Sequence, residues 1–101
     1  MSIAKNFIGK KVIVRGDRSG VFFGTVLDHD KQQVVLKDCR RIYSWQGALE
    51  TNEIAVVGVL DNENTKITRT VDEILINDCI QMQICTNKAI EILESVKVWN
   101  E

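Results

Sequence analysis

The sequence predicts an α+β fold, mainly β, in which a small, strongly bent antiparallel sheet or barrel-like domain carries a short helical insert and a C-terminal helix. Short β-branched runs separated by polar turns predict the strands. Capping residues followed by apolar segments predict the two helices. The chain has 101 residues, of which 45% are hydrophobic, and this fits a single domain over residues 1–101.

The first two predicted strands form a hairpin. Residues 11–14 and 21–27 flank a turn rich in Gly and short polar residues. Both faces of the 21–27 strand are largely apolar, which predicts that the strand is covered on both sides. Gly24 leaves room for a bulge or a crossing side chain.

The rest of the chain predicts further strands and two helices. Thr51 caps a short helix that ends at Gly58 and plugs one end of the sheet. Thr86 caps a helix through Ser95 that packs Ala89, Ile92, Leu93 and Val96 on the sheet. Strands are predicted at 33–37, 39–45, 66–71, 73–76 and 79–84, with a turn at 28–32.

The charges balance overall but not along the chain. The net charge is −1, yet residues 1–45 carry nine Lys or Arg against four Asp, and residues 46–101 carry four against ten acidic residues. This polarity indicates an anion-binding face or head-to-tail contact between copies, and it also fits charges that fold back and cancel. The negative total argues against nucleic acid as a partner.

Composition also narrows the setting and the cofactors. No run of about 18 apolar residues is present to span a membrane, and the N-terminus lacks the apolar core of a secretory signal, so we expect a cytoplasmic protein. Cys39, Cys79 and Cys85 are widely spaced in or beside apolar runs, which indicates structural thiols. His29 is expected in a turn. The spacing predicts no metal site and no cofactor.

The first candidate for binding chemistry is the Gly-rich turn of residues 15–20. Consecutive backbone N–H groups in such a turn make a concave anion site, and Arg15 and Arg18 can add phosphate contacts. It is not a P-loop, because the Gly-Lys-Ser/Thr ending is absent. The alternative is a hairpin loop with solvated arginines.

The second candidate is the strand of residues 39–45. Alternation places Cys39, Arg41, Tyr43 and Trp45 on one face, so that an aromatic ring can stack a base while an arginine holds its phosphate. The alternative is that these aromatic residues pack in the core. The candidate ligand-binding residues are Arg15, Arg18, Ser19, Arg40, Arg41, Tyr43 and Trp45.

Acidic residues offer a third, weaker candidate. Asp72, Glu73 and Asp78 could chelate a hard cation or work as an acid and a base, but they lack the spacing of a calcium loop and no His stands near. Acidic residues at strand ends are ordinarily solubilising. No nucleophile, base and orienting partner can be assembled, so we assign no catalytic residue and expect a protein that is not an enzyme.

Two motifs stand out along the chain, the hairpin RGDRSGVFFG at residues 15–24 and the strand RRIYSWQGA at residues 40–48. They resemble a family of short phage and prophage proteins of uncharacterised function. The later pieces Glu73–Ile76, Cys85–Thr86 and Trp99 also match, so the resemblance runs from about Lys11 to Trp99. It implies a phage context in an infected or lysogenic bacterial host and supplies no site residues.

Residues and resemblance together favour a phage accessory protein that binds a ligand or a host protein. We expect it to counter host defence, for example by sequestering a nucleotide signal, and to form a homo-oligomer. The alternative is a structural or assembly protein that oligomerises without a small-molecule ligand.

Overall fold

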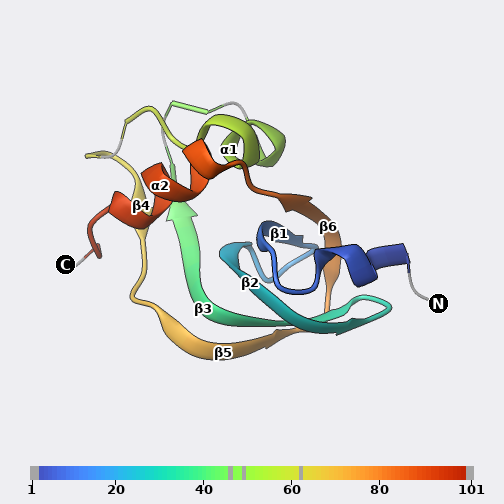
Figure 1. Cartoon of the computed structure of the whole chain (residues 1–101). Helices are drawn as coiled ribbons and strands as arrows, with labels where there is room; N and C mark the ends of the chain where they lie inside the picture. Colours follow the sequence, from blue (N-terminus) through green and yellow to red (C-terminus); the bar gives the residue numbers. More distant parts are fainter. Residues whose placement is uncertain (1–2, 46, 49, 62, 100–101) are drawn as a thin grey trace.

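A bent antiparallel sheet forms the body of the molecule, and two helices lie together over one end of it (Figure 1). The computed structural model describes residues 3–45, 47–48, 50–61 and 63–99. Its elements are a 3-10 helix η1 (Ile3–Phe7), strands β1 (Lys11–Gly16), β2 (Val21–Asp30) and β3 (Gln33–Ser44), helix α1 (Thr51–Val57), strands β4 (Lys66–Ile67), β5 (Val71–Ile76) and β6 (Cys79–Ile84), and helix α2 (Asn87–Ser95). The predicted mainly-β class with a helical insert and a C-terminal helix is confirmed.

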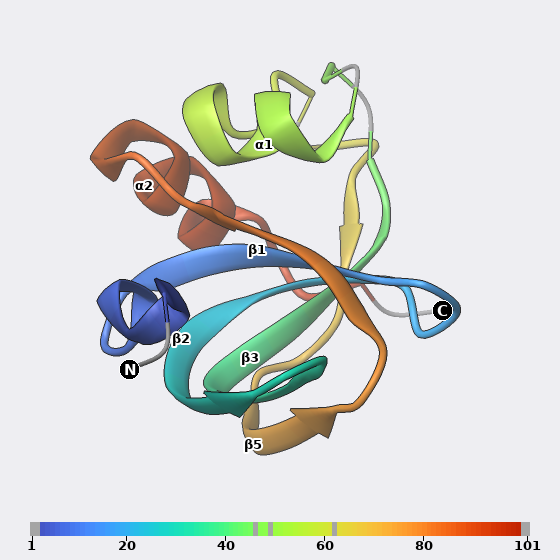
Figure 2. The same ribbon diagram turned by 90° about the vertical axis from the view of Figure 1, so that its right-hand side faces the viewer.

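Every pair of named strands is antiparallel. The order across the sheet is β4, β3, β2, β1 and β6, and β5 also pairs with β3. Strands β4 and β5 therefore follow one another along one edge of β3, while β6 lies at the opposite edge of the sheet. Figure 2 shows the curl of the sheet, with both helices beyond β1 and with β5 at the far end of the molecule.

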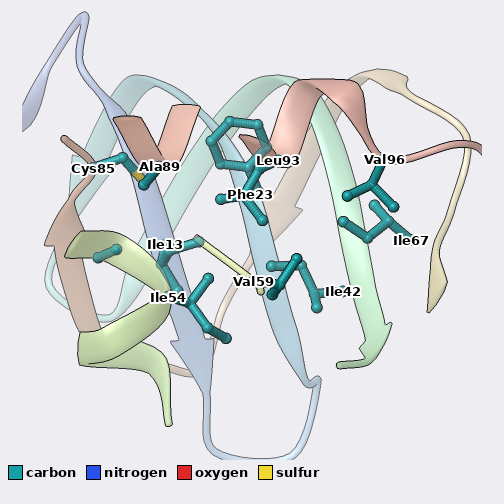
Figure 3. Close-up of a cluster of buried hydrophobic side chains, with 11 residues drawn as sticks. Ile13, Phe23, Ile42, Ile54, Val59, Ile67, Cys85, Ala89, Leu93 and Val96 are labelled. Carbon is teal, nitrogen blue, oxygen red and sulfur yellow. The ribbon is translucent and has the colours of Figure 1, made fainter. Parts of the chain in front are cut away.

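The curl separates two apolar clusters. The inner cluster is enclosed by the sheet and by η1, and the helix-side cluster lies between the sheet and the two α-helices (Figure 3). The buried members of the inner cluster are Val12, Val14, Phe22, Val26, Val34, Leu36, Cys39 and Ile76. Those of the helix-side cluster are Ile13, Phe23, Ile42, Ile54, Ala55, Val59, Ile67, Cys85, Ala89, Leu93 and Val96.

Strand alternation explains both clusters. Neighbouring residues of a strand point to opposite faces, so Phe22 joins the inner cluster and Phe23 joins the helix-side cluster. In the same way Val12 is inner and Ile13 faces the helices. The prediction that β2 is covered on both sides is therefore confirmed.

A bulge in β3 joins the two strands that were predicted at 33–37 and 39–45. Asp38 has a positive φ of 51°, and the register between β2 and β3 shifts opposite it, between Phe23 and Thr25. A Cβ atom on Gly24 would lie 3.2 Å from both the Cα of Cys39 and the carbonyl oxygen of Lys37. Gly24 therefore admits the bulge, as its place in the sequence predicted, and pairing continues past Asp38 instead of ending there.

Two other predicted boundaries were wrong. The turn expected over 28–32 is limited to residues 31 and 32, because Lys31 takes a positive φ of 55° and a tight hairpin lets β2 run on to Asp30. His29 consequently lies in a strand, paired with Val34. The strand expected over 66–71 is divided, since residues 68–70 carry the chain from β4 to β5 along the edge of β3.

The helices agree with prediction except at one cap. Helix α2 spans the expected residues, and the hydroxyl of Thr86 accepts a hydrogen bond from the Ala89 N–H. Helix α1 is capped by Glu50 instead of Thr51, because the Glu50 carboxylate accepts from the Asn52 N–H while the Thr51 hydroxyl accepts from the Gln83 amide.

Substitution of Gly24 tests the bulge. Gly24→Ala should lower the free energy of unfolding by about 1–3 kcal/mol, because backbone atoms of β3 must shift by a few tenths of an ångström to admit the added methyl group. Gly24→Val should cost more, although Val has the higher strand propensity. Urea denaturation measures both, and a Val variant as stable as the parent would contradict the close approach.

Candidate functional site

The Gly-rich loop after β1 is an anion site that the chain fills itself. The carboxylate of Asp78, between β5 and β6, accepts hydrogen bonds from the Arg18 N–H (2.8 Å) and the Ser19 N–H (2.9 Å). It also accepts one from the Ser19 hydroxyl at 2.6 Å. The hydroxyl and the backbone N–H groups lower the pKa of Asp78, which keeps it ionised.

Arg15 and Arg41 lie on opposite faces of the sheet. Cross-strand partners share a face, and Arg15 pairs with Val21, which packs on the helix-side cluster. Arg41 pairs instead with Phe22 of the inner cluster. The sequence-predicted site is therefore divided between a loop closed by Asp78 and a separate part of β3.

Arg40 is buried beneath α2. Its Nε donates to the Thr68 carbonyl oxygen (2.9 Å) and its Nη1 to the Leu93 carbonyl oxygen (3.1 Å) in the last turns of the helix. Within the described residues Nη2 is buried without a partner, and burial lowers the pKa of the guanidinium. Arg40 thus ties β3 to α2 and presents no guanidinium at the surface.

Trp45 does not share a face with Tyr43, which corrects the predicted alternation. Strand β3 ends at Ser44, and Trp45 packs against the helix-side cluster with Ala48. Its indole N–H donates to the Ala48 carbonyl oxygen at 3.2 Å. The loss of strand geometry after Ser44 explains the change of side.

Arg41 and Tyr43 remain together at a surface hollow. The hollow, called here the Arg41–Tyr43 hollow, is lined by Phe22, Cys39, Arg41, Tyr43, Thr68, Val71 and Ile74. The Arg41 guanidinium lies over the Phe22 ring, 4.9 Å from its centroid. Among the described residues Arg41 forms no ion pair. An apolar floor thus stands beside a cation that has donors available.

A second aromatic residue, Trp99, packs on Tyr43, and the sequence analysis did not assign it to the site. The Trp99 ring stacks on it with 5.6 Å between centroids and 7° between planes. The Lys66 ammonium group lies 4.8 Å from the Trp99 centroid. These contacts join segments far apart in the chain, so no local pattern could have indicated Lys66, Thr68 or Trp99.

The cysteines act as small apolar side chains. Burial raises the pKa of the Cys39 thiol to about 12, with the Arg41 charge opposing the rise in part. Burial likewise raises the pKa of Cys85 to about 12. Both thiols are therefore protonated near neutral pH, which suits packing and disfavours attack on a substrate.

The acidic residues do not gather into a metal site. Asp72 and Glu73 are exposed and adjacent on β5, so they point to opposite faces, while Asp78 is bound to Ser19. No group of three or more His, Cys, Asp or Glu side chains able to hold a metal ion occurs in the described part of the chain. Over the same residues, no helix has the length and apolar character needed to cross a membrane.

The bond between Asp78 and the loop predicts an acid-dependent loss of stability. The hydrogen bonds hold the folded-state pKa below the unfolded value, so the carboxylate stabilises the fold at neutral pH, and this contribution disappears as pH falls through the folded-state pKa. At about pH 7 the melting temperature of Asp78→Asn should lie below that of wild type. This difference should close as the pH falls below about 4.

Circular dichroism melts across this pH range provide the measurement. Asp72→Asn, an exposed carboxylate on β5, is the matched control and should show no such gap. A gap for Asp78→Asn that does not change with pH would show that the charge of Asp78 contributes nothing.

Comparison with known proteins gives the fold and the family. The chain is similar to a heptameric archaeal Sm protein, a structure described for its implications for the eukaryotic snRNP core, over 81% of this chain and 94% of that chain, with a TM-score of 0.54 and 14% identity. At this identity the likeness shows the fold alone, which is Sm-like. No curated protein matches the sequence. The model of a domain family of unknown function matches residues 9–93, and the chain therefore belongs to that family, DUF6948.

Proposed function

We propose that this chain is a non-enzymatic binding protein that holds a nucleotide in the Arg41–Tyr43 hollow. One observation carries the proposal. An arginine that has no ion-pair partner among the described residues lies beside an exposed aromatic ring, and an apolar floor joins the two. A nucleotide has the complementary chemistry, since it joins a planar base to an anionic phosphate.

Arg41 supplies the phosphate contact in this proposal. Its position over Phe22 restricts the guanidinium without using its N–H groups, so less entropy is lost when it binds an anion. Its backbone N–H donates to the Thr68 hydroxyl at 3.0 Å, which ties this part of β3 to the opposite wall of the hollow. A bidentate arginine–phosphate contact is among the stronger hydrogen-bonded pairs.

Tyr43 supplies the stacking surface. Its side chain is 63% exposed although Trp99 covers part of it, and this exposure is large for an aromatic residue in a folded domain. Stacking a base on such a ring contributes about 1–3 kcal/mol. The net charge of −1 favours a small nucleotide over a long nucleic acid, whose many phosphates require many cations.

The biological setting follows from the sequence resemblance to phage and prophage proteins. We place the protein in the cytoplasm of an infected or lysogenic bacterium, where it counters host defence by sequestering a nucleotide signal. A stoichiometric binder suits this role because it needs only affinity and abundance. Contact with a host protein would serve the same end.

Nucleotide binding should depend on Arg41 and Tyr43. Isothermal titration with adenosine monophosphate, cyclic AMP and cyclic dinucleotides identifies the strongest probe. Arg41→Ala and Tyr43→Ala should each weaken that probe about tenfold or more, the equivalent of about 1.4 kcal/mol. Adenosine and inorganic phosphate, titrated alone, separate the base from the phosphate.

Arg15→Ala is the matched control, since Arg15 is exposed on the other face of the sheet. It should leave the affinity unchanged. Undiminished binding by Arg41→Ala, or a loss confined to Arg15→Ala, would overturn the assignment. Absence of binding to every probe would remove the nucleotide from the proposal and favour the second function below.

A second candidate function is assembly without a small ligand, favoured by the edge strand β6. In the described structure β6 pairs as a strand only with β1. The Cys79 N–H at the start of β6 donates to the Gln32 carbonyl oxygen at 3.0 Å, and the rest of the outer edge presents unpaired backbone groups. The strand contains no charged residue and no Pro, and Ile80 and Ile84 are 47% and 45% exposed. Edges of this kind add a further strand unless they are protected.

The opposite edge provides a complementary strand. Strand β5 pairs only with β3 within the described residues, has the same length as β6, and exposes Val71 and Leu75. Pairing of β6 with β5 of a second copy is a heterologous contact, which produces a ring if the rotation closes. The heptamer formed by the structurally similar Sm protein supports this arrangement.

Disruption of the β6 edge should dissociate the assembly. Native mass spectrometry of protein purified from bacteria that produce nucleotide signals reads both the subunit number and any mass released on denaturation. Ile84→Lys should yield monomers, whereas Ile8→Lys, at an equally exposed position outside the sheet edges, should not. A monomeric wild type, or an Ile84→Lys variant that stays assembled, would contradict assembly through β6.

A further inference from the structure

The segment of residues 97–99 lies alongside β4. Val98 forms a parallel bridge with Ile67, and the Trp99 N–H donates to the Ile67 carbonyl oxygen at 3.0 Å. On its other side β4 pairs with β3, where Ile67 is the partner of Ile42. These backbone contacts bring the Trp99 side chain onto Tyr43, the residue after Ile42.

Trp99 supports Tyr43 from outside the Arg41–Tyr43 hollow. The two rings are nearly parallel, so Trp99 covers one face of Tyr43. Tyr43 lines the hollow and Trp99 does not, so the hollow meets the other face or the edge of the tyrosine ring. The Lys66 ammonium group near the Trp99 ring adds a cation–π contact that helps to hold the indole.

We infer that residues 97–99 form a clasp in which Trp99 is a positioning residue, holding the Tyr43 ring as a wall of the hollow for the planar part of the ligand. The inference rests on the proposed nucleotide site and adds a segment that is distant from it in sequence. A base stacked on Tyr43 extends the stack of Tyr43 and Trp99, so ligand binding and clasp docking stabilise one another.

The reciprocal coupling can be measured from both ends. Lys97 is exposed, and trypsin cleavage after it releases residues 98–101, so the rate of release reports how firmly the clasp is docked. Affinity for the best mononucleotide probe reports the opposite direction of the same coupling. In a Trp45→Phe background the remaining tryptophan emission comes from Trp99 and gives a third readout.

Trp99→Leu should weaken nucleotide binding about fivefold, the order expected for loss of one aromatic stack, and Trp99→Phe should restore most of it. Val56→Ala, at an exposed position on α1 outside both the hollow and the clasp, is the control and should leave the affinity unchanged. Saturating nucleotide should slow release of residues 98–101 about fivefold, since the coupling is equal in both directions. The Trp99 emission should shift on binding.

Two results would overturn the clasp. If Trp99→Leu binds more tightly and nucleotide speeds tryptic release, the indole competes with the ligand. If Trp99→Leu binds as wild type does, Trp99 has no part in the site. Failure of the proposed function is separable, because Tyr43→Leu should speed release of residues 98–101 without any ligand. If wild type binds no probe, and if residues 98–101 are released from Tyr43→Leu at the wild-type rate, both proposals fail.

Discussion

The fold depends on one constraint, which is that the central strands are apolar on both faces. In β1 and β2 successive residues such as Ile13 and Val14, or Phe22 and Phe23, are all buried, so neither face of the sheet can remain in water. The chain meets this requirement by curling the sheet around the inner cluster and by laying α1 and α2 over the outer face. The helical insert and the helix that follows β6 are therefore necessary parts of the core.

The bulge at Asp38 decides what the arginines do. Leu36 and Cys39 both enter the inner cluster although they are three residues apart, which shows that the alternation of β3 moves by one residue at Asp38. Because of this shift Arg40 points under α2 and Arg41 points to the inner-cluster side. A regular strand would have exchanged the two. The candidate site thus depends on Gly24, which makes the bulge possible from the neighbouring strand.

Local patterns in the sequence predicted most elements but few of the contacts that define the site. β-Branched runs bounded by polar turns located β2 and β6, and Thr86 correctly marked the start of α2. Patterns could not show that the Asp78 carboxylate fills the loop of Arg18 and Ser19, since this contact spans about 60 residues and leaves no local signature. The burial of Arg40 and the stack of Trp99 on Tyr43 are long-range in the same way. The physical idea of a backbone anion site was sound, but its occupant is internal.

The internal contacts also narrow the binding chemistry. Asp78 satisfies the loop and carbonyl oxygens hold Arg40. The ion pair of Glu94 with Lys11, at 2.9 Å, neutralises part of the charge polarity along the chain within one copy. Arg41 and Tyr43 are the predicted pair that the fold leaves together at the surface. Nuclear magnetic resonance mapping of backbone amides during nucleotide titration tests this assignment most directly. The account predicts shifts centred on Arg41, Tyr43, Thr68 and Val71. Shifts confined to residues 15–20 or to the β2–β3 turn, or no shifts at all, would contradict it.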